Sequence, residues 1–128
     1  MLEFLRSRLR SFGPAFAGWW YVLRTQRNAW LHALASLGVF VLAFWLRLGL
    51  RDWALLVFAV ALVWTAEFIN TALEALVDLH SPERHPLAKA AKDVGAAAVL
   101  VAALAAVVIG VLVLGPGVWE RLGPEFGS

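Results

Sequence analysis

Three long apolar runs dominate the pattern of hydrophobic and polar positions along the chain. They cover residues 29–48, 53–77 and 94–114. Because about 20 helical residues at 1.5 Å each match a hydrocarbon core of about 30 Å, each run predicts a membrane-spanning helix. The connection at 49–52 is short, and the segment 80–86 carries two prolines and mixed charge, which predicts a loop.

The third run differs from the others in its small residues and in the segment that precedes it. Residues 87–92 predict a short helical lead-in, after which Asp93 can cap the spanning helix. The run itself is rich in Ala and Gly, which let helix backbones approach each other closely in lipid. We therefore expect the third helix to lie inside a bundle.

The two ends of the chain have their own patterns. Residues 1–28 alternate basic with apolar or aromatic side chains, interrupted at Gly13-Pro14. This predicts an amphipathic surface segment of one or two helices, with rings in the membrane interface and guanidinium groups toward anionic headgroups. Residues 115–128 are rich in Gly and Pro and predict a short flexible tail. The remaining residues, 29–114, form the expected three-helix membrane domain.

Composition and charge agree with a multi-pass membrane protein. Hydrophobic residues make up 62% of the 128 residues and charged residues 16%, outside the range of soluble domains. No cysteine is present, so disulfides and thiol chemistry are excluded, and no signal peptide is evident. Eight Lys and Arg flank the N-terminal side and the second loop, against three on the opposite side. This asymmetry predicts a cytoplasmic N-terminus.

The second run carries polar residues near its cytoplasmic end. At about 100° per residue, Glu67, Glu74 and Asp78 fall within roughly 40° of one another on a helix, with Thr71 between them along the chain. Asn70 lies at the edge of this face. Carboxylates inside a membrane helix are costly unless they are paired, protonated or metal-bound, so this face predicts a functional site.

Two kinds of chemistry suit an acidic face below a basic loop. In phosphoryl transfer, carboxylates hold Mg²⁺ with a polyphosphate, Lys92 and Arg84 meet phosphate charge, and the deeper Glu67 accepts a proton from a lipid alcohol. The Walker and protein-kinase glycine loops are absent. Because the same carboxylates also suit a proton or cation pathway, the residues alone leave both interpretations open.

A resemblance to a known family favours the first interpretation. The chain carries EFINTALEALVD at 67–78 and HPLAKAAKDVGAAAVL at 85–100. The pattern E-x-x-N-[ST]-A-x-E-x-x-x-D, followed by A-K-D, resembles the signature of the prokaryotic diacylglycerol kinase family, which includes undecaprenol kinases, over roughly residues 12–115. The resemblance implies an all-α membrane protein with an N-terminal surface helix and three transmembrane helices. It also implies a homotrimer with active sites between subunits in the bacterial cytoplasmic (inner) membrane, using Mg²⁺ and ATP. No nucleic-acid partner is expected.

The resemblance also implies roles for individual residues. Glu67 matches the catalytic base, Glu74 a metal-ligating carboxylate, and Asn70 a residue that orders the site. The nucleotide side of the family's site matches a larger set, namely Glu83, Arg84, His85, Lys92 and Asp93.

Two positions depart from the family's pattern. Gln26 stands where the family has a second metal-binding Glu, so an amide oxygen replaces a carboxylate. Pro14 stands where many members have Tyr. His32, in the run RNAWLH, and the loop 86–93 resemble the undecaprenol kinase branch. The expected substrate is therefore undecaprenol, with diacylglycerol as the alternative.

Overall fold

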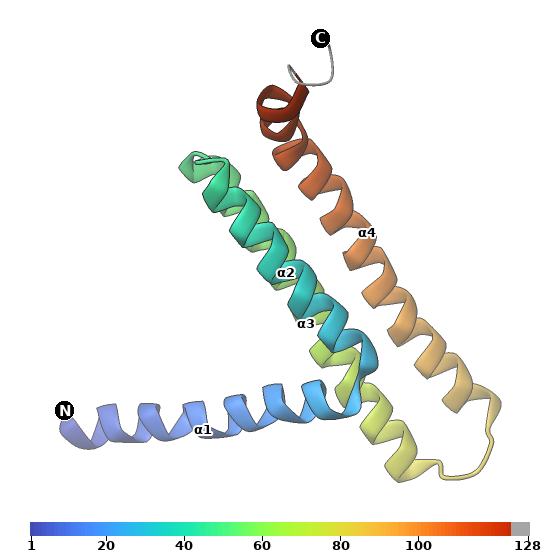
Figure 1. Cartoon of the computed structure of the whole chain (residues 1–128). Coiled ribbons are helices and arrows are strands. Elements are labelled where there is room, and N and C mark those ends of the chain that lie inside the picture. Colours follow the sequence, from blue (N-terminus) through green and yellow to red (C-terminus); the bar gives the residue numbers. More distant parts are fainter. Residues whose placement is uncertain (124–128) are drawn as a thin grey trace.

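The computed structural model describes residues 1–123 and contains four α-helices and no strand in that part of the chain. The helices are α1 (Leu2–Thr25), α2 (Arg27–Trp45), α3 (Leu50–His80) and α4 (Pro86–Leu122). Helices α2, α3 and α4 run side by side, whereas α1 extends away from the lower end of α2 at a large angle (Figure 1). Each of these three is long and apolar enough to cross a membrane, which confirms the three predicted spans.

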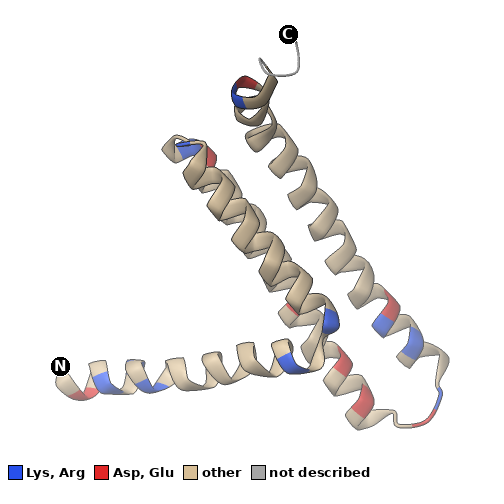
Figure 2. Ribbon diagram, viewed as in Figure 1, with Lys and Arg blue, Asp and Glu red and all other residues tan. Residues whose placement is uncertain are grey.

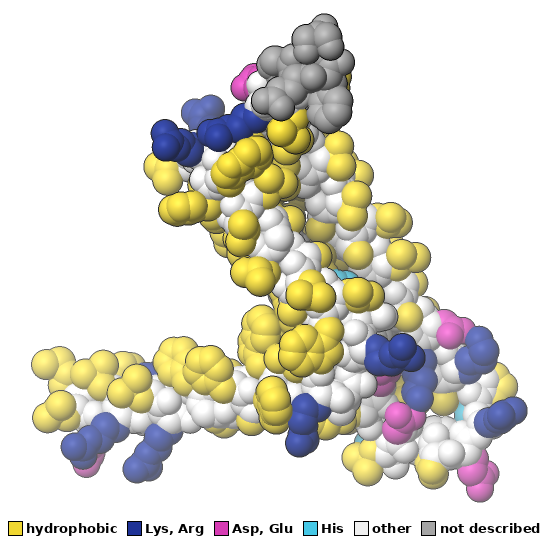
Figure 3. Space-filling view, in the orientation of Figure 1, with side chains coloured by type: hydrophobic (Ala, Val, Ile, Leu, Met, Phe, Trp, Pro, Cys, Tyr) yellow, Lys and Arg dark blue, Asp and Glu magenta, His cyan; other side chains and the backbone are white. Residues whose placement is uncertain are grey.

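Helix α1 is a single helix despite Pro14 in its interior. Of the one or two helices expected here, the structure therefore has one, and Gly13-Pro14 does not interrupt it. A proline removes one backbone N–H and so one helical hydrogen bond, but most of α1 is exposed, where the freed carbonyl can meet solvent or headgroups. Apolar side chains line one side of α1, and Lys or Arg side chains line the other (Figure 3).

Helices α2 and α3 form a hairpin whose turn closes on Arg47. This residue has φ 56°, the left-handed conformation that ends many helices. The N–H of Leu48 donates to the carbonyl of Ala43, and the N–H of Arg47 donates to that of Phe44, which is the Schellman arrangement. A non-glycine residue in this conformation is strained, so Arg47 lowers the stability of the hairpin turn.

Close packing joins the upper ends of the three apolar helices. Leu56 of α3 is 1% exposed and packs with Ala43, Leu46 and Leu114. Gly117 of α4 lies against the side chain of Leu46, where a Cβ would come within 3.3 Å. These contacts hold α4 against the hairpin and explain why the helix continues through its Gly- and Pro-containing end.

The boundaries of α4 correct two predictions. The helix begins at Pro86, and the side chain of His85 caps it by accepting from the N–H of Leu87. The prediction that Asp93 is the cap is therefore wrong, because Asp93 lies inside the helix. The helix also continues past the predicted end at residue 114 to Leu122, so the first part of the predicted tail is helical. The last part, residues 124–128, lies outside the described residues.

Charged residues gather toward the two ends of the apolar helices, with Glu67 further inside α3 (Figure 2). The lower end, which includes the end of α3 and the start of α4, carries most of them. The polar face of α3 opens onto this end, so the fold brings together the segments in which the candidate residues lie.

Candidate active site

Three polar residues of α3 are buried in the otherwise apolar helix. Glu67 is 2% exposed, Asn70 7% and Thr71 4%. Thr71 donates its hydroxyl to the carbonyl of Glu67 at 2.8 Å, which satisfies the hydroxyl within the helix. The buried carboxylate and amide therefore remain available for interactions with other elements.

Glu74, two turns further along α3, is held by two amides. Gln26 donates Nε2 to one carboxylate oxygen at 2.8 Å, and Asn70 donates Nδ2 to the other at 3.4 Å. Gln26 has an extended backbone between α1 and α2, so the bend between those helices directs its side chain at α3. The three residues form one cluster at the junction of α1, α2 and α3.

Glu67 faces a histidine that the sequence pattern did not place in the site. His32 Nε2 of α2 lies 3.5 Å from Glu67 Oε2, and no hydrogen-bond partner for this buried nitrogen is found among residues 1–123. The ring also packs edge-on toward Trp64 at 6.3 Å between centroids. The Trp64 indole donates to the hydroxyl of Ser36, which itself donates to the carbonyl of His32. This chain of contacts fixes the helical turn that carries the histidine.

Aromatic packing fastens α1 to the site. The ring of Trp19 lies 4.4 Å from that of Trp64 and 4.9 Å from that of Phe68, measured between centroids. Trp64 and Phe68 flank Glu67 on α3, so α1 is anchored one turn from the buried carboxylate. Val22 and Ala29 complete this small core.

The loop between α3 and α4 borders a separate pocket of about 580 Å³. The residues predicted on the nucleotide side that line it are Glu83, Arg84, His85 and Lys92, joined by Asp78 and Lys89. Lys92 pairs with Asp78 across the two helices, and Lys89 pairs with Asp93 along α4. Asp93 is exposed. Among the residues predicted on the nucleotide side, it alone is not in the described lining of this pocket.

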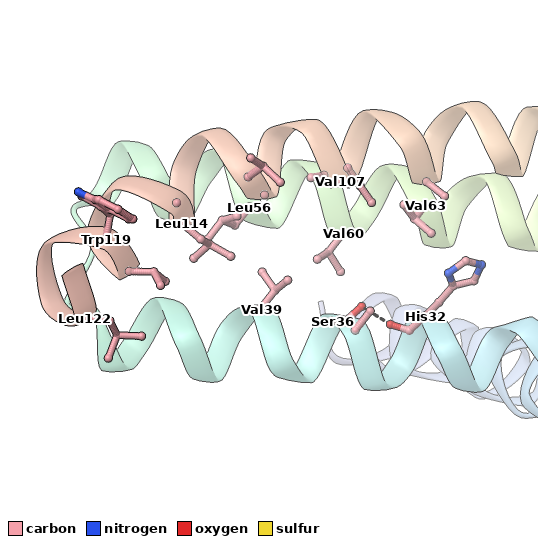
Figure 4. Close-up of a pocket in the computed structure, with 18 of the residues that line it drawn as sticks. His32, Ser36, Val39, Leu56, Val60, Val63, Val107, Leu114, Trp119 and Leu122 are labelled. Carbon is pink, nitrogen blue, oxygen red and sulfur yellow. Dashed lines mark hydrogen bonds between the residues drawn. The ribbon is translucent and has the colours of Figure 1, made fainter. Parts of the chain in front are cut away.

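An apolar groove of about 720 Å³ runs between α2, α3 and α4. His32 and Ser36 lie at one end, and Trp119 and Leu122 lie at the other (Figure 4). Apart from the two polar residues at its head and the indole of Trp119, the described lining consists of Ala, Gly, Val and Leu residues. Since His32 also contacts Glu67, the groove begins beside the buried carboxylate.

Residues 13–114 match the family model described as prokaryotic diacylglycerol kinase. This match covers most of the chain and includes every residue of the clusters above that was predicted from the sequence. The chain belongs to the prokaryotic diacylglycerol kinase family.

Similar proteins of this family are named for two lipid alcohols. The undecaprenol kinase of Bacillus subtilis is 39% identical over 107 residues, which are 84% of this chain and 87% of that protein. The diacylglycerol kinase of Synechocystis is 44% identical over 109 residues, 84% of this chain and 62% of that protein. The diacylglycerol kinase of Escherichia coli is 36% identical over 110 residues, 80% and 87% of the two chains. The protein is therefore a lipid kinase, and of the two interpretations left open by the residues, phosphoryl transfer is supported.

The donor set fits a magnesium ion that is shared with a nucleotide. Within residues 1–123 no three His, Asp or Glu side chains come together to hold a metal. Mg²⁺ typically uses one or two carboxylates and completes its shell with phosphate oxygens and water. Glu74 offers such a carboxylate, and Gln26 beside it offers an amide oxygen.

The sequence pattern missed two features of this kinase site. It gave no sign that His32 faces Glu67, because the two residues lie on different helices and their contact depends on how those helices pack. In the sequence, Gly95 is one of many small residues of the third apolar run, whereas in the structure it lies directly against Asn70. The Lys92–Asp78 pair was within reach of sequence reasoning, since each residue was identified separately.

Proposed function

We propose that the protein transfers the γ-phosphoryl group of ATP to the hydroxyl of undecaprenol at the cytoplasmic side of the bacterial inner membrane. Glu67 accepts the hydroxyl proton, the lipid oxygen forms a bond to the γ-phosphorus, and the bond from that phosphorus to the bridging oxygen breaks. ADP and the lipid monophosphate are the products. The observation that carries the proposal is the buried Glu67 beside His32, which lines the head of an apolar groove, in a chain of this kinase family.

The burial of Glu67 suits it to be the base. Few groups compete for its carboxylate: its described partner beyond its own helix is His32 at 3.5 Å. A base must lie within hydrogen-bond reach of the proton that it removes. The groove leads to this position, so an alcohol whose tail follows the groove places its hydroxyl beside the carboxylate.

The pocket at the α3–α4 loop is the proposed site of ATP. Arg84 and Lys92 supply positive charge for the phosphates, while Glu83, His85 and Asp93 contribute on the nucleoside side. Lys92 is paired with Asp78 in the structure, and exposed ion pairs contribute little to stability, so phosphate can replace that partner. Glu74 and Gln26 would hold Mg²⁺, which when bound neutralises phosphate charge and orients the transferred group.

The groove favours a polyprenol over a diacylglycerol. A polyprenol carries one hydroxyl on a hydrocarbon tail, whereas a diacylglycerol also carries two ester groups close to its hydroxyl. Beyond His32 and Ser36 at the head, the described lining offers no hydrogen-bond donor until Trp119 at the far end. Ester oxygens placed in the groove would lose their water without gaining donors, at about 1–3 kcal/mol for each buried acceptor.

The proposed setting is a membrane-embedded homotrimer. Helix α1, within residues 1–28, lies along the cytoplasmic surface, residues 29–114 form the kinase domain, and residues 115–128 follow as a short tail. Two observations support this arrangement. The two sides of α1 differ in polarity, and only 11–39% of the apolar stretches are buried within one chain, which leaves surface for lipid and for other copies (Figure 3).

The proposal is tested with Glu67→Gln, which keeps the size of the side chain but removes its basicity. Loss of a general base lowers turnover by about 10²–10⁴-fold, so the variant should be almost inactive while it assembles normally. Glu120→Gln, at the far end of α4, is the matched control and should retain full activity. Full phosphate transfer to undecaprenol by the Glu67 variant would remove Glu67 from the role of base.

A further inference from the structure

Helices α3 and α4 approach each other most closely where Gly95 meets Asn70. A Cβ at position 95 would lie 2.3 Å from Asn70 Oδ1, below any separation that real Cβ atoms adopt. The next nearest atom is Asn70 Cγ, at 3.4 Å. The amide of Asn70 is therefore what a side chain at position 95 would displace.

The amide of Asn70 is confined on both sides. Its Nδ2 donates to Glu74 Oε1, and its Oδ1 is buried against Gly95 with no hydrogen-bond partner in the described structure. An amide normally rotates to satisfy both of its ends. Here the α4 backbone occupies one side, and the rotamer that serves Glu74 leaves the oxygen without a donor.

We propose that Gly95 is a positioning residue of the kinase site, acting through Asn70 on the carboxylate of Glu74. The absence of a side chain on α4 lets the Asn70 amide keep its nitrogen on Glu74. With a Cβ in place and α4 where it lies, the Asn70 amide must turn away, and Glu74 then keeps the bond from Gln26 but loses the bond from Asn70. The inference rests on the proposed function in one respect, namely that Glu74 binds the metal.

The role is specific to the metal side of the site. Asn70 reaches Glu74, whereas the described contacts of the Glu67 carboxylate are to His32 instead. A substitution at Gly95 should therefore weaken metal binding and leave the alcohol side of the site in place. A residue that only allowed helices to pack would change both sides together.

The test compares Gly95→Ala with Gly38→Ala in the full chain, purified in detergent micelles. Gly38 lies on the exposed face of α2, and a Cβ at this position would have no described atom within 4 Å, so its variant controls for the added methyl group. Binding of Mn²⁺ alone is followed by electron paramagnetic resonance, without lipid or nucleotide. Residues that orient a metal ligand typically contribute 10–100-fold to affinity, so Gly95→Ala should weaken Mn²⁺ binding at least about tenfold.

Two further measurements separate positioning from packing. In active protein, Gly95→Ala should raise the Mg²⁺ needed for half-maximal rate while the KM for undecaprenol stays within about twofold, as expected when one ligand-orienting contact is lost. The double variant Asn70→Ala/Gly95→Ala removes the clash, so its Mn²⁺ affinity should equal that of Asn70→Ala alone. If Gly95→Ala does not fold, the double variant should fold and still give this equality.

Equal Mn²⁺ affinity in Gly95→Ala and wild type would overturn the proposal, as would additive losses in the double variant. Because Mn²⁺ binding is measured without turnover, the role of Gly95 and the proposed kinase function can be refuted independently. Failure of phosphate transfer in wild type would refute the proposed function while the Gly95 comparison still stood.

Discussion

Replacing Gln26 by glutamate tests whether Glu74 lies in a metal site. In the structure, Gln26 Nε2 donates to Glu74 Oε2 at 2.8 Å, so the neutral amide stabilises the carboxylate without adding charge. Gln26→Glu removes that donor and places a second carboxylate at the same position. The metal-free protein should become less stable, and a bound divalent cation should stabilise it more than it stabilises wild type.

The magnitudes follow from the hydrogen bond and the added charge. Loss of a hydrogen bond to a charged group costs about 1.5–3 kcal/mol. Two like charges about 4 Å apart repel by about 1–4 kcal/mol between the dielectric limits of water and a protein surface, which suits these partly buried residues. If the second carboxylate tightens Mg²⁺ binding tenfold, saturating Mg²⁺ adds about 1.4 kcal/mol of stabilisation relative to wild type.

The assay is thermal unfolding in detergent micelles without nucleotide. Unfolding is measured first in the presence of a chelator and then across a Mg²⁺ titration. Gln26→Ala is the control, because it removes the hydrogen bond but adds no charge. We expect Gln26→Glu to unfold earlier than Gln26→Ala in chelator and to gain more from Mg²⁺. Identical Mg²⁺ responses in Gln26→Glu and wild type would refute the assignment of Glu74 and Gln26 to the metal.

Three further predictions concern packing around the helices. Leu56→Ala should destabilise the protein by about 2 kcal/mol through the cavity that it leaves, while the exposed Leu55→Ala changes unfolding by less than about 0.5 kcal/mol; equal effects would contradict the packing. Arg47→Gly should raise the free energy of unfolding by about 1 kcal/mol, because glycine adopts φ 56° without strain; a loss would count against the turn. Trp64→Phe should lower the free energy of unfolding by about 1 kcal/mol, because the hydrogen bond to Ser36 is lost. The double variant Trp64→Phe/Ser36→Ala should lose less free energy of unfolding than the sum of the two single variants.

Much of the fold could be predicted from periodicity and length. The three apolar helices appear where the apolar runs lie, because a membrane-spanning segment needs a length that the sequence displays directly. The ends of the helices were harder to predict from the sequence. Asp93 resembles a cap by residue type, but Pro86 fits the first turn of a helix and His85 caps it, so the helix begins earlier.

In the candidate site too, features within one helix could be predicted, whereas contacts between helices could not. Glu67 and Glu74 could be identified because spacing along one helix places them on one face. Their partners could be identified only where a family pattern existed, as for Gln26. The contacts of His32 with Glu67 and of Gly95 with Asn70 depend on how α2 and α4 pack against α3, which no local pattern encodes.

The most direct test of the account is phosphate transfer from labelled ATP with Mg²⁺ in mixed micelles, with undecaprenol and a diacylglycerol offered side by side. We expect preferential labelling of undecaprenol by the folded, assembled protein. Preferential labelling of the diacylglycerol would keep the kinase but contradict the proposed use of the apolar groove. Labelling of neither lipid would contradict the proposed function itself.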